Sequence, residues 1–414
     1  MKQTEIGLIP DDWEVKSLGE IGEPCMCKRI LKEQTSPTGD IPFYKIGTFG
    51  GIPDAYISRE LFEQYKEQYN YPKKGTLLLS AAGTIGRVVV FDGKDSYFQD
   101  SNIVWIDNDE TKVTNDFLFY CYSRMQWKTE EGGIVSRLYN ANLKSTSFIA
   151  PKSLAEQQRI AKALSDVDAL ISTTEKLIQK KKNIKQGTMQ NLLTGKKRLP
   201  GFGDKQTDLF VPNGTHTKEV KDVSPEQIRL SVKMKQTELG EIPEDWEVKS
   251  LGEMLKIGHG KDYKNLKSGN VPVYGTGGYM TSVNDFLYEG ETVCIGRKGT
   301  IDKPQYHSGK IWTVDTLFYT YDFKSLNPKY LFYKFCLIDW LSMNEASGVP
   351  SLTAKNIEDI QITIPTEEEQ TAIANVLSSM DKEIETLNTK LEKYRNLKTA
   401  MMQQLLTGKI RLIK

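Results

Sequence analysis

Two stretches of the chain repeat apolar residues at alternating steps of four and three. In residues 367–414 the repeating positions are Ile373, Leu377, Met380, Ile384, Leu387, Leu391, Tyr394, Met401 and Leu405, and Lys398 interrupts them. In residues 153–199 they are Ile160, Leu164, Val167, Ile171, Thr174 and Ile178, followed by Ile184, Leu192 and Leu193. This heptad pattern predicts two coiled-coil helices. Each would span roughly 60 Å, so we expect the two apolar stripes to bury against each other.

The segments before these helices carry a different pattern. Short runs of β-branched and apolar residues, bounded by glycine, aspartate or asparagine, predict strands at Thr76–Ser80, Arg87–Phe91, Ile103–Ile106 and Thr292–Ile295. Helical patterns at Asp116–Gln126 and Lys329–Asp339 interrupt the strands. Each segment is therefore predicted to be a mixed α and β domain, and the fold class to be α+β.

The chain also repeats itself. Residues Met1–Glu20 recur as Met234–Glu253 with 17 of 20 positions identical, and Glu156–Leu199 aligns with Glu369–Leu412 without a gap. A period above 200 residues indicates a duplicated pair of domains and not a solenoid of short repeats. The offset falls from 233 in the first match to 213 in the second, so the second copy is 233 − 213 = 20 residues shorter. Tyr56–Tyr69 is predicted to be part of the excess.

The repeat and the two patterns together divide the chain. For 414 residues, domains of about 150 residues predict two or three domains. We place mixed domains at residues 1–152 and 234–366, long helices at 153–199 and 367–414, and a linker at 200–233. The linker follows neither period and is rich in residues typical of loops, namely Pro200, Gly201, Gly203, Pro212, Asn213 and Gly214.

Charge and composition narrow the function classes. Lysine plus arginine number 55 and aspartate plus glutamate 54, so the net charge is +1 and any basic surface must be local. No apolar run reaches the roughly 18 residues that cross a bilayer, and the first residues lack the apolar core of a secretion signal. Five scattered cysteines do not form a disulfide framework. We therefore expect a cytoplasmic protein without a membrane partner.

Positive charge gathers at the end of the first predicted helix. Eight basic residues with no acidic residue among them occupy this segment: Lys176, Lys180, Lys181, Lys182, Lys185, Lys196, Lys197 and Arg198. Such a cluster could follow the phosphates of a nucleic acid. The alternatives are a solvated helix face and a surface that docks another subunit.

Motifs of catalysis are absent from the sequence. It contains neither G-x-x-x-x-G-K-[ST] nor G-x-G-x-x-G, so we expect no phosphate-binding loop of these types. The three histidines, His216, His259 and His307, lie far apart, and there is no H-E-x-x-H or C-x-x-C, so we expect no metal site. The sequence therefore favours a non-catalytic protein without a cofactor of its own.

Glycine-rich loops with polar, basic and aromatic side chains are the candidate binding surfaces of both mixed domains. Arginine and lysine can read guanine edges and asparagine can read adenine, so these loops are candidates for contacts with double-stranded DNA. The candidates are Tyr44, Lys45, Thr48, Ser80, Thr84, Arg87, Arg137, Tyr139 and Asn140 in the first domain, and Tyr274, Thr276, Arg297, Lys298, Thr300, Ser351, Thr353 and Lys355 in the second. The alternative is that they are ordinary surface loops.

Comparison of the two copies sorts these candidates by role. Positions that are identical in both copies, such as Gly83, Thr84, Trp127 and Asn142, should hold the shared architecture or contact phosphates. Positions that differ should specify the bases that each copy reads. These are Lys45, Arg87, Arg137, Tyr139, Arg297, Lys298, Thr353 and Lys355.

An apolar cluster lies near the end of each predicted helix. The clusters consist of Met189, Leu192 and Leu193 in the first copy and Met401, Met402, Leu405 and Leu406 in the second. Long exposed helices with more apolar surface than their seam requires often dock partners, so we expect these residues to bind another subunit. The alternative is that they close the coiled coil against the mixed domains.

Three motifs occur in the same order in both copies. W-E-V-K-S-L-G-E opens each mixed domain, I-x-I-P…E-Q-x-x-I-A at Ile362–Ala374 leads into the long helix, and L-L-T-G-K closes it, while the first copy departs slightly at Phe148–Pro151. In this combination, over nearly the whole chain, the sequence resembles the specificity subunit of Type I restriction-modification systems. The resemblance implies two mixed α/β target recognition domains, related by a pseudo-twofold internal duplication and separated by two long helices that form an antiparallel coiled coil.

The resemblance also implies a function. Each target recognition domain would read one half of a bipartite, asymmetric site in double-stranded DNA, and the helices would set the spacer and dock two modification subunits. These methyltransferase subunits and the restriction subunits, which are motor-nucleases, would carry the S-adenosylmethionine, Mg and ATP. The residues alone leave open a coiled-coil scaffold or interaction protein without DNA readout.

Overall fold

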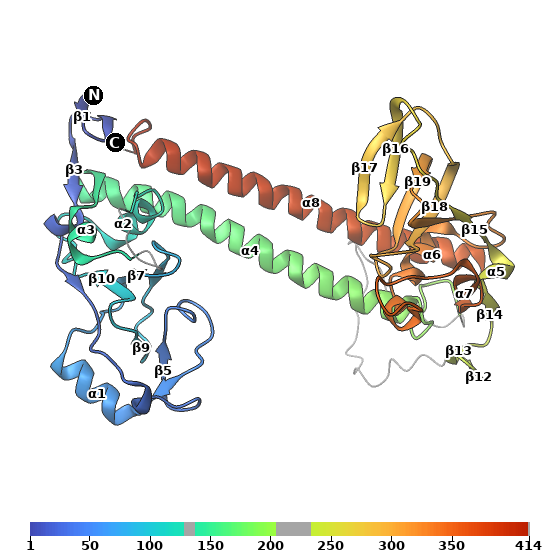
Figure 1. Cartoon of the computed structure of the whole chain (residues 1–414), viewed down its shortest axis with the longest axis horizontal. Helices are drawn as coiled ribbons and strands as arrows, with labels where there is room; N and C mark the ends of the chain where they lie inside the picture. The colour runs from blue at the N-terminus through green and yellow to red at the C-terminus, as the bar shows by residue number, and fades with distance from the viewer. Residues whose placement is uncertain (128–136, 204–232, 413–414) are drawn as a thin grey trace, which may run out of the picture. The chain divides into compact units, whose positions relative to one another are not determined.

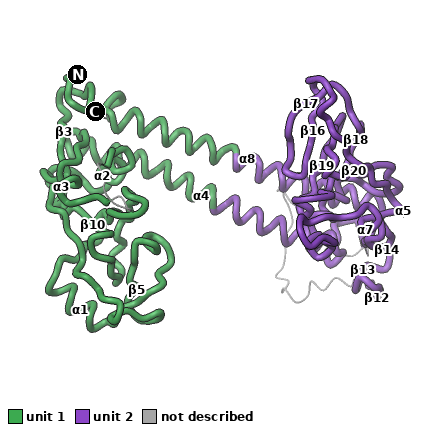
Figure 2. Tube along the Cα trace, viewed as in Figure 1, with its two compact units in different colours: residues 1–175, 389–414 green, residues 176–388 purple. Residues whose placement is uncertain are grey.

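The chain is divided between two compact units. The computed structural model describes residues 1–127, 137–203 and 233–412, so residues 204–232 of the predicted linker lie outside the described residues (Figure 1). Unit 1 consists of residues 1–175 and 389–414, and unit 2 of residues 176–388 (Figure 2). The two long helices, α4 at Leu154–Leu192 and α8 at Glu367–Leu405, both confirm the heptad prediction. Because each helix contributes one end to each unit, unit 1 is built from two separate stretches of sequence.

The strands of unit 1 form four sheets within its described residues. A hairpin of β1 (Lys2–Thr4) and β2 (Gly7–Ile9) precedes β3 (Trp13–Ser17), which pairs with β11 (Ser147–Pro151). A four-stranded sheet has the order β4 (Pro24–Cys25), β10 (Ile103–Ile106), β7 (Leu77–Ser80) and β8 (Val88–Val90). A three-stranded sheet has the order β6 (Tyr56–Ile57), β5 (Ile41–Tyr44) and β9 (Tyr97–Phe98).

The helices of unit 1 cover these sheets. They are α1 (Arg59–Gln68), α2 (Asn115–Tyr122) and α3 (Asn140–Ser145), with short 3-10 turns at Leu18–Glu20 and Lys32–Gln34. Thr114 begins α2 because its hydroxyl accepts a hydrogen bond from the Phe117 amide. Trp13 and Phe117 are fully buried in one core with Ile160 of α4 and Leu406, which follows α8. The ends of both long helices therefore belong to the core of unit 1.

Unit 2 contains the second mixed domain. A hairpin of β12 (Met234–Thr237) and β13 (Gly240–Pro243) precedes β14 (Glu247–Ser250), which pairs with β21 (Gln361–Ile364). A six-stranded sheet has the order β15 (Lys256–His259), β20 (Leu317–Tyr321), β18 (Tyr288–Gly296), β19 (Gln305–Thr313), β16 (Ser268–Gly275) and β17 (Gly278–Val283). Its helices are α5 (Leu251–Met254), α6 (Pro328–Phe335) and α7 (Ala354–Glu358), with a 3-10 turn at Trp340–Met343.

The two mixed domains share one topology, as the repeat predicts. In unit 1, β5 pairs in parallel with β9, and in unit 2, β16 pairs in parallel with β19. The helices expected at Asp116–Gln126 and Lys329–Asp339 are present as α2 and α6, and both are shorter than predicted. Helix α1 lies within the predicted excess at Tyr56–Tyr69. In unit 2 residues 284–287 between β17 and β18 hold no helix, so α1 is an insertion in the first domain.

Within each unit the two long helices run antiparallel. In unit 1, Glu175 and Asp168 of α4 pair with Arg395 and Lys398 of α8, so residue numbers fall on α4 as they rise on α8. In unit 2, Lys181 pairs with Glu383 at 2.7 Å and Lys185 pairs with Asp381. The apolar seam is largely as predicted.

Ile184 is an exception to the predicted seam. It is exposed, whereas its neighbour Lys185 reaches Asp381 on α8 and lies over the Tyr333 ring. The prediction for Ile184 is wrong because a long lysine stem with a carboxylate partner occupies the contact face. Heptad spacing alone cannot anticipate this arrangement.

An arginine that follows each long helix binds two carboxylates in the same way. In unit 2 Arg198 donates to Glu369 at the start of α8 and to Asp245 before β14, with distances of 2.6–2.9 Å. In unit 1 Arg411 donates to Glu156 and Asp12, also at 2.6–2.8 Å. We call each set an arginine clamp. The two clamp arginines follow the two L-L-T-G-K motifs, and their partners Glu369 and Glu156 lie at the starts of the two long helices.

Candidate nucleic-acid interface

In unit 1 three candidate segments meet at one end of the four-stranded sheet. The loop from β7 to β8 forms an isolated antiparallel bridge between Ala82 and Arg137, and the Leu138 amide donates to the Ala81 carbonyl at 2.8 Å. The loop is tied internally by Ser80, whose hydroxyl donates to the Thr84 carbonyl and accepts from the Arg87 amide. The sequence-predicted residues Ser80, Thr84, Arg87 and Arg137 are therefore brought together.

The loop after β5 lies beside the same site. The Gln99 side chain accepts a hydrogen bond from the Ile46 amide at 2.9 Å, and Thr48 accepts one from the Lys45 amide at 3.1 Å. Tyr44 stacks on Phe98 with ring centroids 5.8 Å apart. The Lys45 ammonium pairs with Asp54 at 2.9 Å, so this predicted base-reading group already has a partner within the chain.

An open hollow of about 790 Å³ lies between these segments and the turn after β4. Its charged lining residues are Arg29, Lys32, Lys45 and Arg137 against Asp54 and Asp100, which leaves 4 − 2 = 2 positive charges. Arg29 pairs with Asp100 at 2.8 Å. Arg29 and Lys32 are not among the sequence-predicted residues, although they belong to one short basic stretch that follows no hydrophobic period.

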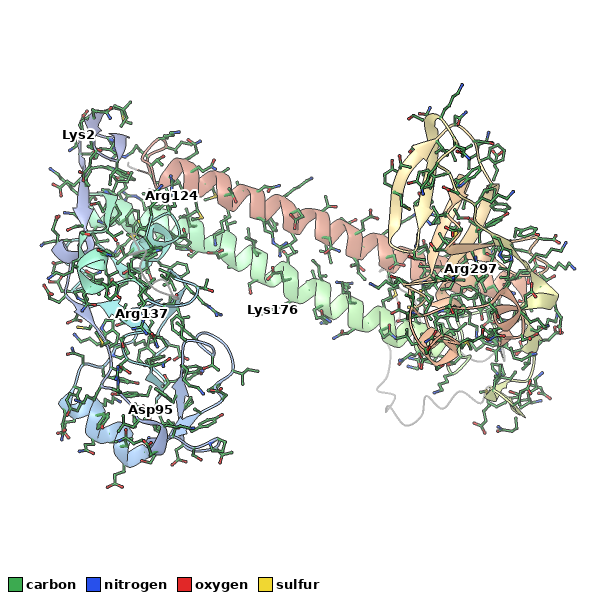
Figure 3. The ribbon with its side chains drawn as sticks, in the orientation of Figure 1. Lys2, Asp95, Arg124, Arg137, Lys176 and Arg297 are labelled. Atoms are coloured by element: carbon green, nitrogen blue, oxygen red, sulfur yellow. The ribbon has the colours of Figure 1, made fainter. Side chains whose placement is uncertain are left out.

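Unit 2 repeats this construction with different side chains. The loop from β18 to β19 forms an isolated bridge between Lys298 and Ser351, and the Leu352 amide donates to the Arg297 carbonyl at 2.9 Å. The Arg297 guanidinium donates to the Asp315 carbonyl at 3.3 Å. Figure 3 labels Arg137 in unit 1 and Arg297 in unit 2.

In the two equivalent bridges, the basic residue lies on different sides of the bridge. In unit 1 the basic side chain is Arg137, and its partner is the small Ala82. In unit 2 the basic side chain is Lys298, and its partner is Ser351. The same backbone frame therefore presents a different arrangement of donors in each unit. This is the arrangement expected of two domains that read different ligands with one architecture.

The remaining loop candidates lie at helix starts. Tyr139 and Asn140 are exposed at the beginning of α3. Thr353 begins α7, and its hydroxyl accepts the Asn356 amide at 3.2 Å, so the hydroxyl caps the helix. Lys355 pairs with Asp359 at 2.7 Å, and this hydrogen bond raises the pKa of Lys355. Thr353 and Lys355 therefore have local structural partners.

A second hollow, of about 760 Å³, lies in unit 2 between the β16–β17 hairpin, the loop before β19, α6 and α8. It is lined by the predicted residues Tyr274, Thr276 and Thr300. His307 stacks on Tyr274 with ring centroids 3.7 Å apart, and burial lowers the pKa of His307 to about 4. His307 and the lysines of this lining were not predicted as site residues. The lysines are Lys303, Lys329 and Lys382.

The predicted partner-binding clusters are not exposed. Met189, Leu192 and Leu193 are buried in the core of unit 2, and Leu405 and Leu406 are buried in the core of unit 1. Met401 and Met402 are partly buried against the same core of unit 1. Most of these side chains therefore pack against the mixed domains, as the alternative expects, and do not form an exposed docking surface in this structure. These side chains fill the cores of the two units.

The basic cluster at Lys176–Arg198 is divided between structural and exposed groups. Arg198 belongs to an arginine clamp, and Lys181 and Lys185 pair with α8. The other five residues, Lys176, Lys180, Lys182, Lys196 and Lys197, are exposed. On the same helix Leu170, Leu177 and Ile184 are exposed apolar residues at heptad spacing.

Comparison with known proteins identifies the family. Residues 10–186 and 243–393 match the sequence model of the Type I restriction modification DNA specificity domain. Because these residues make up more than half of the chain, the protein belongs to the family of Type I restriction-modification specificity subunits, which confer DNA sequence specificity on the restriction-modification complex.

Individual relatives agree with this family. The chain is 59% identical over 160 residues to a type I restriction enzyme specificity subunit of Haemophilus influenzae, and the match covers 39% of this chain and 41% of that relative. It is 28% identical to the MjaX specificity subunit of Methanocaldococcus jannaschii, over 99% of this chain and 96% of that relative. A crystal structure of a Type I restriction-modification S subunit from M. genitalium has the same fold, with a TM-score of 0.61, 15% identity and 98% of both chains covered.

The described residues contain neither a membrane-spanning helix nor a cluster of metal ligands. Within residues 1–127, 137–203 and 233–412, no helix is both long enough and apolar enough to span a membrane. The part of the chain that the structure describes also holds no group of three or more histidine, cysteine, aspartate or glutamate side chains placed to bind a metal ion.

Proposed function

We propose that the mixed domain of each unit is a target recognition domain that reads one half of a bipartite, asymmetric site in double-stranded DNA. The observation that carries this proposal is the pair of equivalent loop bridges with different basic residues, Ala82 with Arg137 and Lys298 with Ser351. A common frame can hold each domain on the DNA backbone, and the exchanged side chains can distinguish bases.

The side chains divide between base readout and positioning. Arg137, Arg297 and Lys298 lie on the bridged loops and have no carboxylate within ion-pair distance among the described residues, so they are our candidates for base contacts. Arg29 and Lys45 are held by Asp100 and Asp54. Such paired cations fit orientation of the loops better than base readout, because a base would have to replace the carboxylate.

The chain acts with partner subunits and is itself non-catalytic in this proposal. Two modification subunits would bind S-adenosylmethionine and methylate adenine, and restriction subunits would use Mg and ATP, all in the cytoplasm. Helices α4 and α8 would set the spacer between the half-sites. In place of the buried clusters, the exposed face of α4 with Leu177 and Ile184, flanked by Lys176 and Lys180, is the surface that we assign to a modification subunit.

A domain exchange tests this function. The full chain would be expressed with its modification partner, and methylated adenines would be mapped across the host genome. Replacing residues 21–150 by the equivalent segment of a relative should change one half of the methylated site and preserve the other half. Loss of both halves, or an unchanged site, would refute independent readout.

The scaffold alternative is tested by direct binding. The purified full chain would be mixed with a library of random DNA duplexes at low salt, and bound duplexes would be recovered and sequenced. A specificity subunit should enrich two separated sequence elements. A scaffold should recover no duplexes above background.

A further inference from the structure

Each unit presents an exposed apolar side chain at an equivalent strand connection. In unit 1 the connection from β5 to β6 contains Gly50, Gly51 and Ile52. In unit 2 Thr276 and Gly277 connect β16 to β17, and Gly278 and Tyr279 are the first two residues of β17. Ile52 is 87% exposed, the largest value for a large hydrophobic side chain among the described residues, and Tyr279 is 64% exposed. We call these two connections the tips.

The sheet topology shows that the tips are equivalent. The strand before each tip makes the parallel pairing that the two units share, Tyr44 opposite Phe98 and Tyr274 opposite Thr313. In unit 2, Tyr279 lies opposite Tyr274 across the hairpin. Exposure of an apolar side chain at the same place in two copies is therefore a property of the architecture and not of one loop.

The tips adjoin the candidate DNA-binding loops. In unit 1 the Arg87 guanidinium lies against Gly50, 3.2 Å from the position that a Cβ would take. In unit 2 the hydroxyl of Thr276 lies 3.7 Å from the equivalent position on Gly299, next to Lys298. Residues 48–53 and 274–281 contain no acidic residue, and Asp54, two positions after Ile52, is paired with Lys45. The tip of unit 1 is thus set beside the Arg87 guanidinium, and the turn of unit 2 lies beside the loop that carries Lys298.

The backbone of the tips is narrow. Gly50 and Gly278 have φ of +71° and +106°, a conformation that favours glycine, and the glycine pairs leave no side chain beside Ile52 or Tyr279 on one flank. Proteins that bend DNA insert apolar side chains such as isoleucine as wedges between base steps. An exposed apolar side chain on a narrow loop suits this role.

We infer that Ile52 and Tyr279 are wedges that insert between adjacent base pairs, one in each half-site, and partly unstack that step. This inference rests on the proposed function, because it needs duplex DNA bound at the recognition loops. The wedge adds readout through the deformability of the base step, which the basic side chains do not sense.

The test uses duplexes recovered from the random library by the purified full chain. A fluorescent adenine analogue, whose emission rises when it is unstacked, is placed in turn along each half-site. Binding of the wild-type chain should raise the emission at one step in each half-site. Ile52→Ser should abolish the rise in one half-site and Tyr279→Ser the rise in the other, and each should weaken binding by about tenfold.

Two exposed apolar residues outside the tips serve as matched controls. Ile6 and Leu239 occupy equivalent positions of the repeat and are 46% and 45% exposed, so Ile6→Ser and Leu239→Ser should leave emission and affinity unchanged. Wild-type binding without any rise, or full affinity in both tip variants, would overturn the wedge while the proposed function stands. Failure of the wild-type chain to recover any duplex would overturn both.

Discussion

The Arg198 guanidinium donates two hydrogen bonds of 2.6 Å to the Glu369 carboxylate, which is only 1% exposed. Burial raises the pKa of Glu369, although Arg198 opposes this effect. Arg198→Met should therefore leave a buried carboxylate without a counter-ion. We expect a loss of about 3–5 kcal/mol in the free energy of unfolding of unit 2, measured by urea denaturation near neutral pH.

A matched exposed arginine and the pH provide the controls for this prediction. Arg395 is half-exposed and pairs with Glu175 and Glu392 in solvent, so Arg395→Met should destabilise the chain far less than Arg198→Met does. Part of the loss in Arg198→Met should be recovered as the pH falls toward the raised pKa of Glu369, because the protonated carboxyl needs no counter-ion. Equal losses in both variants would contradict the clamp.

The buried position of Leu406 predicts the effect of a charge there. Leu406→Asp should destabilise unit 1 by at least about 3 kcal/mol, because it removes an apolar side chain from the core and places a carboxylate in it. The exposed Leu397 on α8 is the control, and Leu397→Asp should change stability by less than about 1 kcal/mol. Thermal unfolding measures both. Unchanged stability of Leu406→Asp with loss of a modification subunit would restore the docking hypothesis.

The basic residues of the two bridges, Arg137 and Lys298, should each affect the specificity of one half-site only. Arg137→Ala should cost about 1–3 kcal/mol in binding free energy at one position of one half-site, and Lys298→Ala should do so only in the other half-site. Competition with duplexes that carry single substitutions measures this effect. A variant that weakens binding to every duplex equally, with a lower salt dependence, would instead assign its side chain to a phosphate.

His307 makes unit 2 sensitive to acid. Burial lowers its pKa from 6.5 to about 4, so the unfolded chain takes up a proton first as the pH falls. The stability linked to this group is fully present above about pH 6.5 and is lost as the pH falls toward about 4. His307→Phe keeps a ring to stack on Tyr274 and should reduce the fall in urea midpoint between these pH values. An identical fall in the variant would exclude this linkage.

The sequence predicts regular elements well because their signals are local and periodic. The heptads of α4 and α8 and the strands around Ile103 and Val293 follow directly from spacing. Burial at the helix ends depends on what packs there, and the apolar pattern of Leu405 is the same for a core contact and for a docking surface. The spacing likewise gave no indication that Lys185 would take the place of Ile184 at the contact with α8.

The candidate site was only partly predictable for a related reason. Arg137 and Arg297 were found because glycine-rich loops with basic residues are visible in sequence. The bridge of Arg137 with Ala82 and the backbone hydrogen bond of Arg297 with Leu352 join segments far apart in the chain, and no local pattern reports such pairings. Arg29 and His307 gained their interest only from the hollows that they line.

The arginine clamps have a consequence for the integrity of the chain. Arg198, from the first half of the sequence, completes unit 2, and Arg411, from the second half, completes unit 1. Each half of the sequence therefore supplies residues that the unit formed mainly by the other half needs. A protease cut between Gly203 and Lys233 should not release either half. Separately translated halves should find each other and rebuild both units without a covalent connection.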